Sequence, residues 1–230
     1  MKTSKIIFIT LLSSIAIIIL VVMISLRLNG QRWSEYDNKL KVNKKPLQTF
    51  SVLCIDNSDK LTVTGSETSY IEVSTPEKDA TPVVDYTTKG DTLMLTGIHN
   101  APNSPVFVKI YISKEVKTIK LENSDIMIGQ YNSDNLSLNL ASSKAYFLIN
   151  KVNSTRIGTL QISARNISSV TLNSMIIDTL GVVLQNSTVT MAVSANTVSG
   201  TLSDRSKLFI NQPGEISLKR DPTSRIFMYN

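Results

Sequence analysis

A short phrase that recurs five times between residues 121 and 210 constrains this fold more than any other feature. Each copy runs from an aliphatic residue through small polar residues into a second apolar run; the copies are 121–126, 140–145, 162–167, 184–189 and 202–207. The leading residues are 19, 22, 22 and 18 positions apart, and apolar residues alternate with polar ones around each phrase. Alternation places the apolar residues on one face of a strand. Because such a face is buried only when coils stack, the pattern predicts an all-β fold, a parallel β-helix (solenoid).

The phrases also predict which side chains stack. If the leading residues align, they form one column of the core, and the residues just before the first three point outward. The predicted core column is Leu121, Leu140, Ile162 and Leu184, and the predicted outward residues are Lys120, Asn139 and Gln161. The fourth coil departs from this rule, because Val183 precedes Leu184.

The turns carry Asn-Ser or Ser-Ser pairs at residues 123–124, 142–143 and 186–187. Asn tolerates a left-handed backbone, and both residue types bond their own turns. We therefore expect a ladder of hydrogen bonds inside one corner of the solenoid. A polar ladder that binds glycans is the alternative.

The N-terminal residues indicate a membrane anchor. Residues 6–26 carry no charge, and as a helix they would span about 32 Å, against about 30 Å of bilayer core. This predicts a short tail at residues 1–5 and one transmembrane helix at residues 6–27. A cleavable signal peptide is the competing interpretation, but the run is longer than the usual apolar stretch of about 7 to 15 residues and has no Ala-x-Ala-like site.

The net charge of +6 belongs to the flanks of this segment. Residues 1–45 hold eight basic and two acidic side chains, whereas residues 46–230 hold 16 of each. The charge therefore predicts contact of residues 6–27 and of a basic linker, residues 28–48, with membrane lipids, and it argues against nucleic acid as a partner. The β-helix domain is expected at residues 49–230.

Two rules disagree about the orientation of the anchor. The C-terminal flank is the more basic, which favours a cytoplasmic domain. Lys2 and Lys5 with a short tail are instead typical of an uncleaved signal sequence. We expect a single-pass protein of a bacterial membrane whose C-terminal domain is extracytoplasmic, in the periplasm.

The order of the strands resembles a known family. The segments 61–65, 70–73, 90–95 and 106–112 precede the repeats that begin at residue 119, and this order is similar to that of the bacterial head-GIN domain family, the auto-transporter adhesin-like domains. The resemblance covers residues 48–215. Gly-Ser-Gly turns, frequent in that family, are mostly replaced here by Asn-Ser and Ser-Ser. The resemblance implies a β-helical, extracytoplasmic domain and transfers no catalytic residues.

The residues with catalytic chemistry are few. His99 is the only histidine and Cys54 the only cysteine, and these two residues cannot supply the three or four ligands of a usual zinc site. A Ser-His-Asp triad is also not indicated, because the sequence has no Gly-x-Ser-x-Gly motif for a catalytic serine. Cys54 lies in an apparent strand and is expected to be buried; a single cysteine excludes an intrachain disulfide. We expect no cofactor and no metal.

A polysaccharide-cleaving enzyme is an alternative function, because four aspartates lie near turns and glycoside hydrolysis uses two nearby carboxyl groups. They are Asp125, Asp134, Asp178 and Asp204. They occupy different positions in the repeat. Asp125 is expected to face Lys144 in the next coil, and Asp204 precedes Arg205. We therefore favour four solvent-exposed aspartates without a catalytic role over a catalytic pair.

We predict a membrane-anchored, non-catalytic envelope protein whose β-helix is a structural, binding or adhesion module. Its expected partners are envelope polysaccharide or another envelope protein. The candidate binding surface consists of outward polar side chains: Ser137, Asn139, Thr159, Gln161, Thr188 and Thr190. The alternatives are a carbohydrate-active enzyme on the same scaffold and an assembly subunit whose anchor helix packs with other membrane proteins.

Overall fold

The computed structural model describes residues 15, 17–25, 27, 40–76, 83–99, 107–148, 155–173, 175–211 and 213–229. The chain divides into two units, Met1–Lys41 with Pro76–Lys78, and Val42–Thr75 with Asp79–Asn230. The described residues between 15 and 27 are helical. Among all described residues, no helix is both long and apolar enough to cross a membrane. The expected tail, 1–5, and residues 6–14, 16 and 26 of the expected anchor lie outside the described residues.

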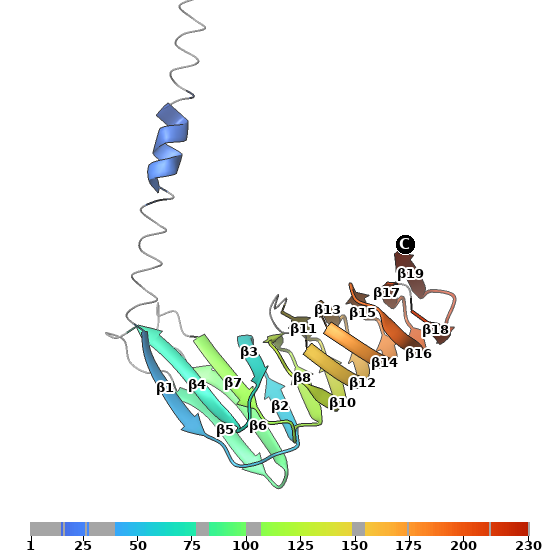
Figure 1. Cartoon of the computed structure of the whole chain (residues 1–230), viewed down its shortest axis with the longest axis horizontal. Helices are drawn as coiled ribbons and strands as arrows, with labels where there is room; N and C mark the ends of the chain where they lie inside the picture. The colour runs from blue at the N-terminus through green and yellow to red at the C-terminus, as the bar shows by residue number, and fades with distance from the viewer. Residues whose placement is uncertain are drawn as a thin grey trace, which may run out of the picture. The chain divides into compact units, whose positions relative to one another are not determined.

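The second unit contains two sheets between which the chain alternates (Figure 1). Sheet A contains, in spatial order, β1 (Leu40–Pro46), β4 (Tyr70–Pro76), β7 (Phe107–Ile112), β3 (Asp59–Gly65), β9 (Asp125–Ile128), β11 (Lys144–Phe147), β13 (Ser169–Leu172), β15 (Thr188–Met191), β17 (Lys207–Asn211) and β19 (Arg225–Tyr229). Sheet B contains β18 (Glu215–Arg220), β16 (Ala195–Ser203), β14 (Met175–Gln185), β12 (Thr155–Arg165), β10 (Ser133–Ala141), β8 (Thr118–Glu122), β2 (Val52–Asp56), β6 (Thr92–His99) and β5 (Val83–Lys89). From β8 onward each coil adds one strand to sheet B and one to sheet A, parallel to its neighbours. The predicted all-β solenoid is confirmed.

The N-terminal end of the stack departs from a simple solenoid. The coil β2–β3 lies between the coils β8–β9 and β6–β7, so the chain leaves the stack and returns to it. On the way, β4 pairs with β7 and β5 pairs with β6, both antiparallel. The strand β1, next to β4, falls within residues 28–48, where a linker was expected. Its pattern is too polar to be read as a strand, but Lys44 contacts Glu72 at 3.6 Å and Lys45 lies over the Tyr86 ring.

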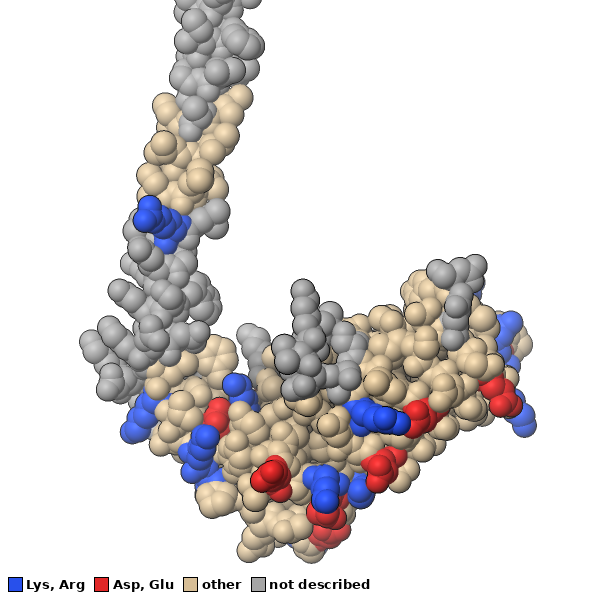
Figure 2. Space-filling view, viewed as in Figure 1, with Lys and Arg blue, Asp and Glu red and all other residues tan. Residues whose placement is uncertain are grey.

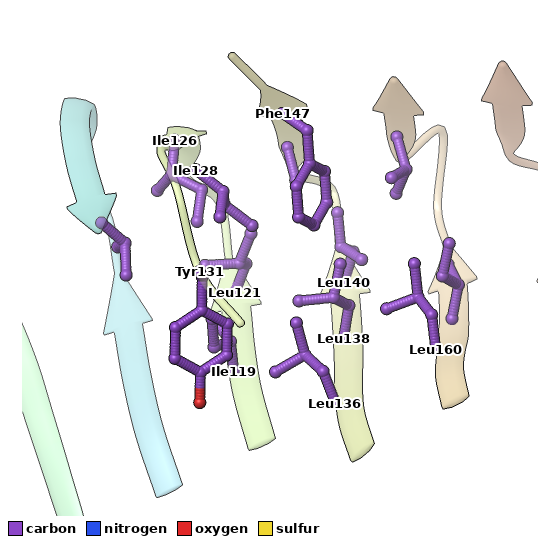
Figure 3. Close-up of a cluster of buried hydrophobic side chains, with 14 of the residues drawn as sticks. Ile119, Leu121, Ile126, Ile128, Tyr131, Leu136, Leu138, Leu140, Phe147 and Leu160 are labelled. Atoms are coloured by element: carbon purple, nitrogen blue, oxygen red, sulfur yellow. The ribbon is translucent and has the colours of Figure 1, made fainter. Parts of the chain in front are cut away.

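The core fills the space between the two sheets (Figure 3). Leu136, Leu138 and Leu140 of β10 alternate with outward residues and are at most 3% exposed. Phe147 and Tyr131 are also buried, and the Tyr131 hydroxyl donates a hydrogen bond to the Val116 carbonyl. The sequence period therefore reports the buried face of each strand correctly.

The strand register corrects one member of the predicted core column. Leu140 pairs with Leu121 as expected, but its partner in β12 is Ala164, while Ile162 pairs with Leu138. The core position before each corner lies three or four residues before the buried corner serine, at Leu140 before Ser143 and at Ala164 before Ser168, so Ala164 takes the place predicted for Ile162. The shift is by two residues, so Ile162 stays buried, 2% exposed, and Gln161 stays outward.

A ladder of buried serines runs along one corner of the solenoid, as the turn residues predict. Its members are Ser58, Ser124, Ser143, Ser168, Ser187, Ser206 and Ser224, none more than 4% exposed. The backbone N–H of each of the first six donates to the hydroxyl of the next member at 3.1 or 3.2 Å. The hydroxyls of the first six donate in turn to a carbonyl two or three residues earlier in their own chain segments. Burial leaves these hydroxyls no access to a glycan, so we refer to this set as the serine ladder and assign it a structural role.

Candidate functional site

The six residues predicted to form one binding surface lie on two different sheets. Ser137, Asn139, Thr159 and Gln161 belong to neighbouring strands of sheet B, where the register pairs Ser137 with Gln161. Thr188 and Thr190 belong to β15 of sheet A. The hydrophobic core lies between the sheets. The structure therefore brings four of the six together and places the other two on the opposite side of the core.

The four residues on sheet B belong to a larger array of polar side chains. The row of outward residues nearest the corner of the solenoid is Ala141, Arg165, Gln185 and Ser203. We call the twelve other outward residues in the middle of β10, β12, β14 and β16 the polar face. Strand register aligns them in three rows: Asn135, Thr159, Thr179 and Thr197; Ser137, Gln161, Gly181 and Ser199; Asn139, Ser163, Val183 and Thr201. Only Gly181 and Val183 lack a hydroxyl or amide group.

Sequence reasoning missed six members of this face: Asn135, Ser163, Thr179, Thr197, Ser199 and Thr201. Aligning the repeats on their leading aliphatic residues placed Gln161 beside Asn139, two residues out of register. The observed offset between β10 and β12 is 24 residues, whereas the leading aliphatic residues of these coils are 22 apart and the ladder serines Ser143 and Ser168 are 25 apart. Neither spacing in the sequence gives the observed rows.

The Gln161 side chain lies close to the backbone of the neighbouring strand β14. A side chain at Gly181 would meet it, since a Cβ atom there would lie 1.9 Å from Gln161 Oε1. The Gln161 amide therefore lies across Gly181. Val183, 56% exposed, is the one apolar side chain in the three rows.

A charged cleft adjoins the first row of the polar face. It lies where β10, β12 and β14 begin and has a volume of about 630 Å³. Three cationic and three acidic side chains line it: Lys114, Lys117, Arg156, Glu115, Asp134 and Asp178. Arg156 Nη2 is 3.9 Å from Asp178 Oδ2, and the Arg156 backbone N–H donates to Asn132 Oδ1 at 2.8 Å. The cleft can receive ligand groups of either charge.

The four aspartates considered for catalysis are separated into two environments. Asp134 and Asp178 share the cleft. Asp125 lies in sheet A, where its carboxylate accepts a hydrogen bond from Lys144 Nζ at 3.0 Å, as predicted, and this contact raises the pKa of Lys144. Asp204 lies at a corner and accepts a hydrogen bond from Gln185. Only one pair of these carboxylates is therefore placed together.

Cys54 and His99 belong to the neighbouring strands β2 and β6 of sheet B. Cys54 is partly exposed, because Leu53 and Ile55 on either side of it take the buried positions of β2. The prediction of a buried thiol is wrong in this respect, although partial burial does raise the pKa of Cys54. His99 ends β6, where it pairs with Val83. In the described part of the chain, no group of three His, Cys, Asp or Glu side chains is arranged to hold a metal ion.

Comparison with known proteins finds similarity in structure alone. No protein-family model and no curated protein matches the sequence. A Bacteroides fragilis protein described as a "putative adhesin" has a TM-score of 0.50 and 12% identity, over 83% of this chain and 97% of its own. A Parabacteroides distasonis protein with the same description has a TM-score of 0.51 and 14% identity, over 83% and 94%. Such similarity establishes a shared fold, and the resemblance to the head-GIN family stays a prediction.

Proposed function

We propose that this chain is a non-catalytic binding module, anchored in a bacterial membrane, whose polar face and adjoining cleft hold an extended envelope polysaccharide. The observation that carries the proposal is the alignment of hydroxyl and amide side chains in rows. Strands are about 4.8 Å apart, and outward residues repeat about every 6.6 Å along each strand. The result is a flat grid of donors and acceptors, which suits a chain of sugar hydroxyls.

The chemistry of the polar face favours many weak contacts. Each hydrogen bond to an exposed hydroxyl or amide contributes about 0.5–1.5 kcal/mol net. Affinity then comes from the number of contacts along the polymer and from tethering at the membrane. Figure 2 shows acidic and basic side chains interspersed on the visible face, without an extended patch of one sign. A largely uncharged polymer therefore fits the polar face better than a nucleic acid does.

The charged cleft supplies a place for ionic groups on the same polymer. Lys114, Lys117 and Arg156 offer cationic donors at its rim, and they suit carboxylates of acidic sugars. The acidic side chains beside them suit amino groups. Because Asp134, Gly158 and Asp178 of the cleft directly precede residues of the first row of the polar face, one polymer can contact both.

The membrane anchor belongs to the same proposal. Residues 6–26 contain no charge, and the described side chains of residues 17–24 are 50–66% exposed. A helix that is apolar on every side is most stable in hydrocarbon, where its backbone groups are already paired. The basic residues that follow suit anionic lipid head groups. Fusion of alkaline phosphatase after Asn230 tests the orientation: an active fusion supports a periplasmic domain, and an active cytoplasmic reporter contradicts it.

Proteins of the same fold support the binding function. The Bacteroides fragilis and Parabacteroides distasonis proteins carry the description "putative adhesin", and adhesins act by binding. We extend that class of function to this chain as part of the proposal.

Co-sedimentation with insoluble, purified cell-wall polysaccharide tests the binding surface. The double variant Asn139→Ala/Gln161→Ala removes two groups of the polar face and should weaken binding about 5-fold or more. The control, Thr188→Ala/Thr190→Ala, removes two polar groups from sheet A and should bind like the unchanged protein. Equal losses in both variants, or no loss in the first, would contradict the assignment of the surface.

The shared cleft of Asp134 and Asp178 favours one alternative, a polysaccharide-cleaving enzyme. Such chemistry needs two carboxyl groups about 5–9.5 Å apart beside the scissile bond. Incubation with the same polysaccharide distinguishes the two functions, since the binding module releases no soluble sugar. Release that is abolished by Asp134→Asn or Asp178→Asn, and kept by the control Asp125→Asn, would replace the binding function by the enzymatic one.

A further inference from the structure

The two ends of the solenoid are finished differently. At the N-terminal end, the antiparallel strands β4 and β5 and the strand β1, which carries Lys44, Lys45 and Pro46, follow the last parallel coils. Lysine and proline on edge strands are common devices against further pairing. At the other end, β18 and β19 are the edges of sheets B and A, and no other described strand pairs with those edges (Figure 1). Unpaired edges of this kind are templates for another strand.

The last coil also exposes side chains that belong to the core. Ile216 is aligned with Val198, which is fully buried, yet Ile216 is 38% exposed. In β19, Met228 is aligned with the buried Ile210 and is 58% exposed. Leu218 and Ile226 are only partly buried against the core. Solenoids need a polar capping element at their ends, and this coil presents an apolar one.

We propose that a second copy of this chain covers the exposed end, with β18 pairing antiparallel to β18 of the partner copy across a two-fold axis. Such an interface uses the same patch on both copies. In an antiparallel pair of strands, each residue lies directly opposite one residue of the other strand. A two-fold axis perpendicular to the sheet, midway between the two β18 strands, therefore places one residue of β18 opposite the same residue of the second copy. Ser217, in the middle of β18, is the residue that the sequence of this strand selects.

The side chains of β18 complement themselves in that register. With Ser217 opposite its copy, Ile216 faces Leu218 of the second chain, and both point toward the core side. Glu215 and Lys219, both exposed and on the outer side, then face each other twice. Opposite charges in cross-strand pairs stabilise a sheet, whereas like charges destabilise it.

Neighbouring registers lose this complementarity. Centring the pair on Leu218 sets Ile216 opposite Arg220, and centring it on Ile216 sets Glu215 opposite Ser217. A slip by one residue is excluded by the two-fold symmetry, and it would also move the core side chains to the outer face. The charges of β18 therefore specify one register.

The edge strand of sheet A has the same property. With Phe227 opposite its copy, Ile226 faces Met228, which pairs two apolar side chains on the core side. On the outer side, Phe227 already stacks on Phe209, with ring centroids 4.5 Å apart. Arg225 would face Tyr229, a favourable cation–aromatic pair. Both edges of the last coil are thus suited to a second copy.

A disulfide trap tests the proposal on the purified full chain in detergent. The native Cys54 is replaced by serine, and Ser217→Cys is introduced at the predicted two-fold axis. Opposite Cβ atoms in an antiparallel pair are about 4.5–5.5 Å apart, close enough for a disulfide after a small adjustment. The control is Ser199→Cys, which the register aligns with Ser217 one strand further from the edge. Oxidation should give a covalent dimer with Ser217→Cys and a monomer with Ser199→Cys.

Charge reversal tests the register in the same assay. Glu215→Lys or Lys219→Glu alone sets like charges opposite each other at both symmetry-related positions and should reduce crosslinking at least threefold. The double reversal Glu215→Lys/Lys219→Glu again places opposite charges facing each other and should restore the dimer. A monomer with Ser217→Cys, equal crosslinking at both positions, or reversals without effect would each overturn the proposal.

Discussion

Replacing Ser143 by alanine tests the serine ladder at one position. The Ser143 hydroxyl accepts a hydrogen bond from the Ser124 backbone N–H at 3.1 Å and donates one to the Ala141 carbonyl at 2.7 Å. Both Ser124 and Ser143 are 1% exposed, so water does not replace the lost group. The substitution changes no apolar contact of the core column.

The magnitude follows from the partners that remain. The Ala141 carbonyl still accepts a hydrogen bond from the Asn123 backbone N–H at 3.0 Å. The Ser124 N–H, however, loses the acceptor to which it is bonded. A buried donor left without a partner costs about 1–3 kcal/mol. We therefore expect Ser143→Ala to lower the free energy of unfolding by that amount.

The matched control is Ser163→Ala, the same chemical change on an exposed residue of the polar face, which should stay within about 0.5 kcal/mol. Equilibrium unfolding of residues 42–230 in denaturant, followed by circular dichroism, measures both variants, and the slopes should be equal if only stability changes. Equal midpoints for the two variants would refute the argument that the ladder hydroxyls satisfy buried backbone groups.

Three further predictions use the same unfolding assay. Leu140→Ala should cost about 2–5 kcal/mol and Asn139→Ala less than about 0.5, because only the first leaves a cavity; equal costs would contradict the register. Burial raises the pKa of Tyr131 to about 12, so as the pH rises the unfolded chain loses the Tyr131 proton before the folded chain does. The free energy of unfolding should therefore fall between about pH 10 and 12, and it should fall less in Tyr131→Phe. Hydrogen bonds from Ser224 and the Asp204 backbone lower the pKa of Asp221 to about 2. The ionised Asp221 therefore adds to the free energy of unfolding above about pH 4, and this addition is lost as the pH falls toward 2. Asp221→Asn should remove that part of the acid dependence.

Much of the fold could be predicted from local pattern. Alternation along each strand gave the correct buried residues, such as Leu138 and Ile162, because side-chain direction in a strand depends only on the parity of the position. The turn pairs gave the ladder, because left-handed Asn and buried Ser act within a few residues of chain. These are short-range properties, and they survive an error of two residues in the alignment.

The candidate site could be predicted only in part. Ser137 and Gln161 were correctly placed outward, but which outward residues become neighbours depends on register and on the sheet to which each strand belongs. Thr188 fulfils the same alternation as Thr159 and lies on the other sheet. The charged cleft gathers Lys114, Asp134 and Asp178 from three coils, and no spacing in the sequence links them.

The sequence by itself therefore determined the repeat, the buried face of each strand and the ladder corner, since each follows from steric and hydrogen-bonding preferences of adjacent residues. The tertiary structure alone decided the order of the first coils, in which β2–β3 is inserted between β6–β7 and β8–β9, and the exposed end formed by β18 and β19. Both depend on backbone pairing between distant segments, and every strand edge offers the same N–H and C=O groups. The choice among partners is made by the packing of the whole stack.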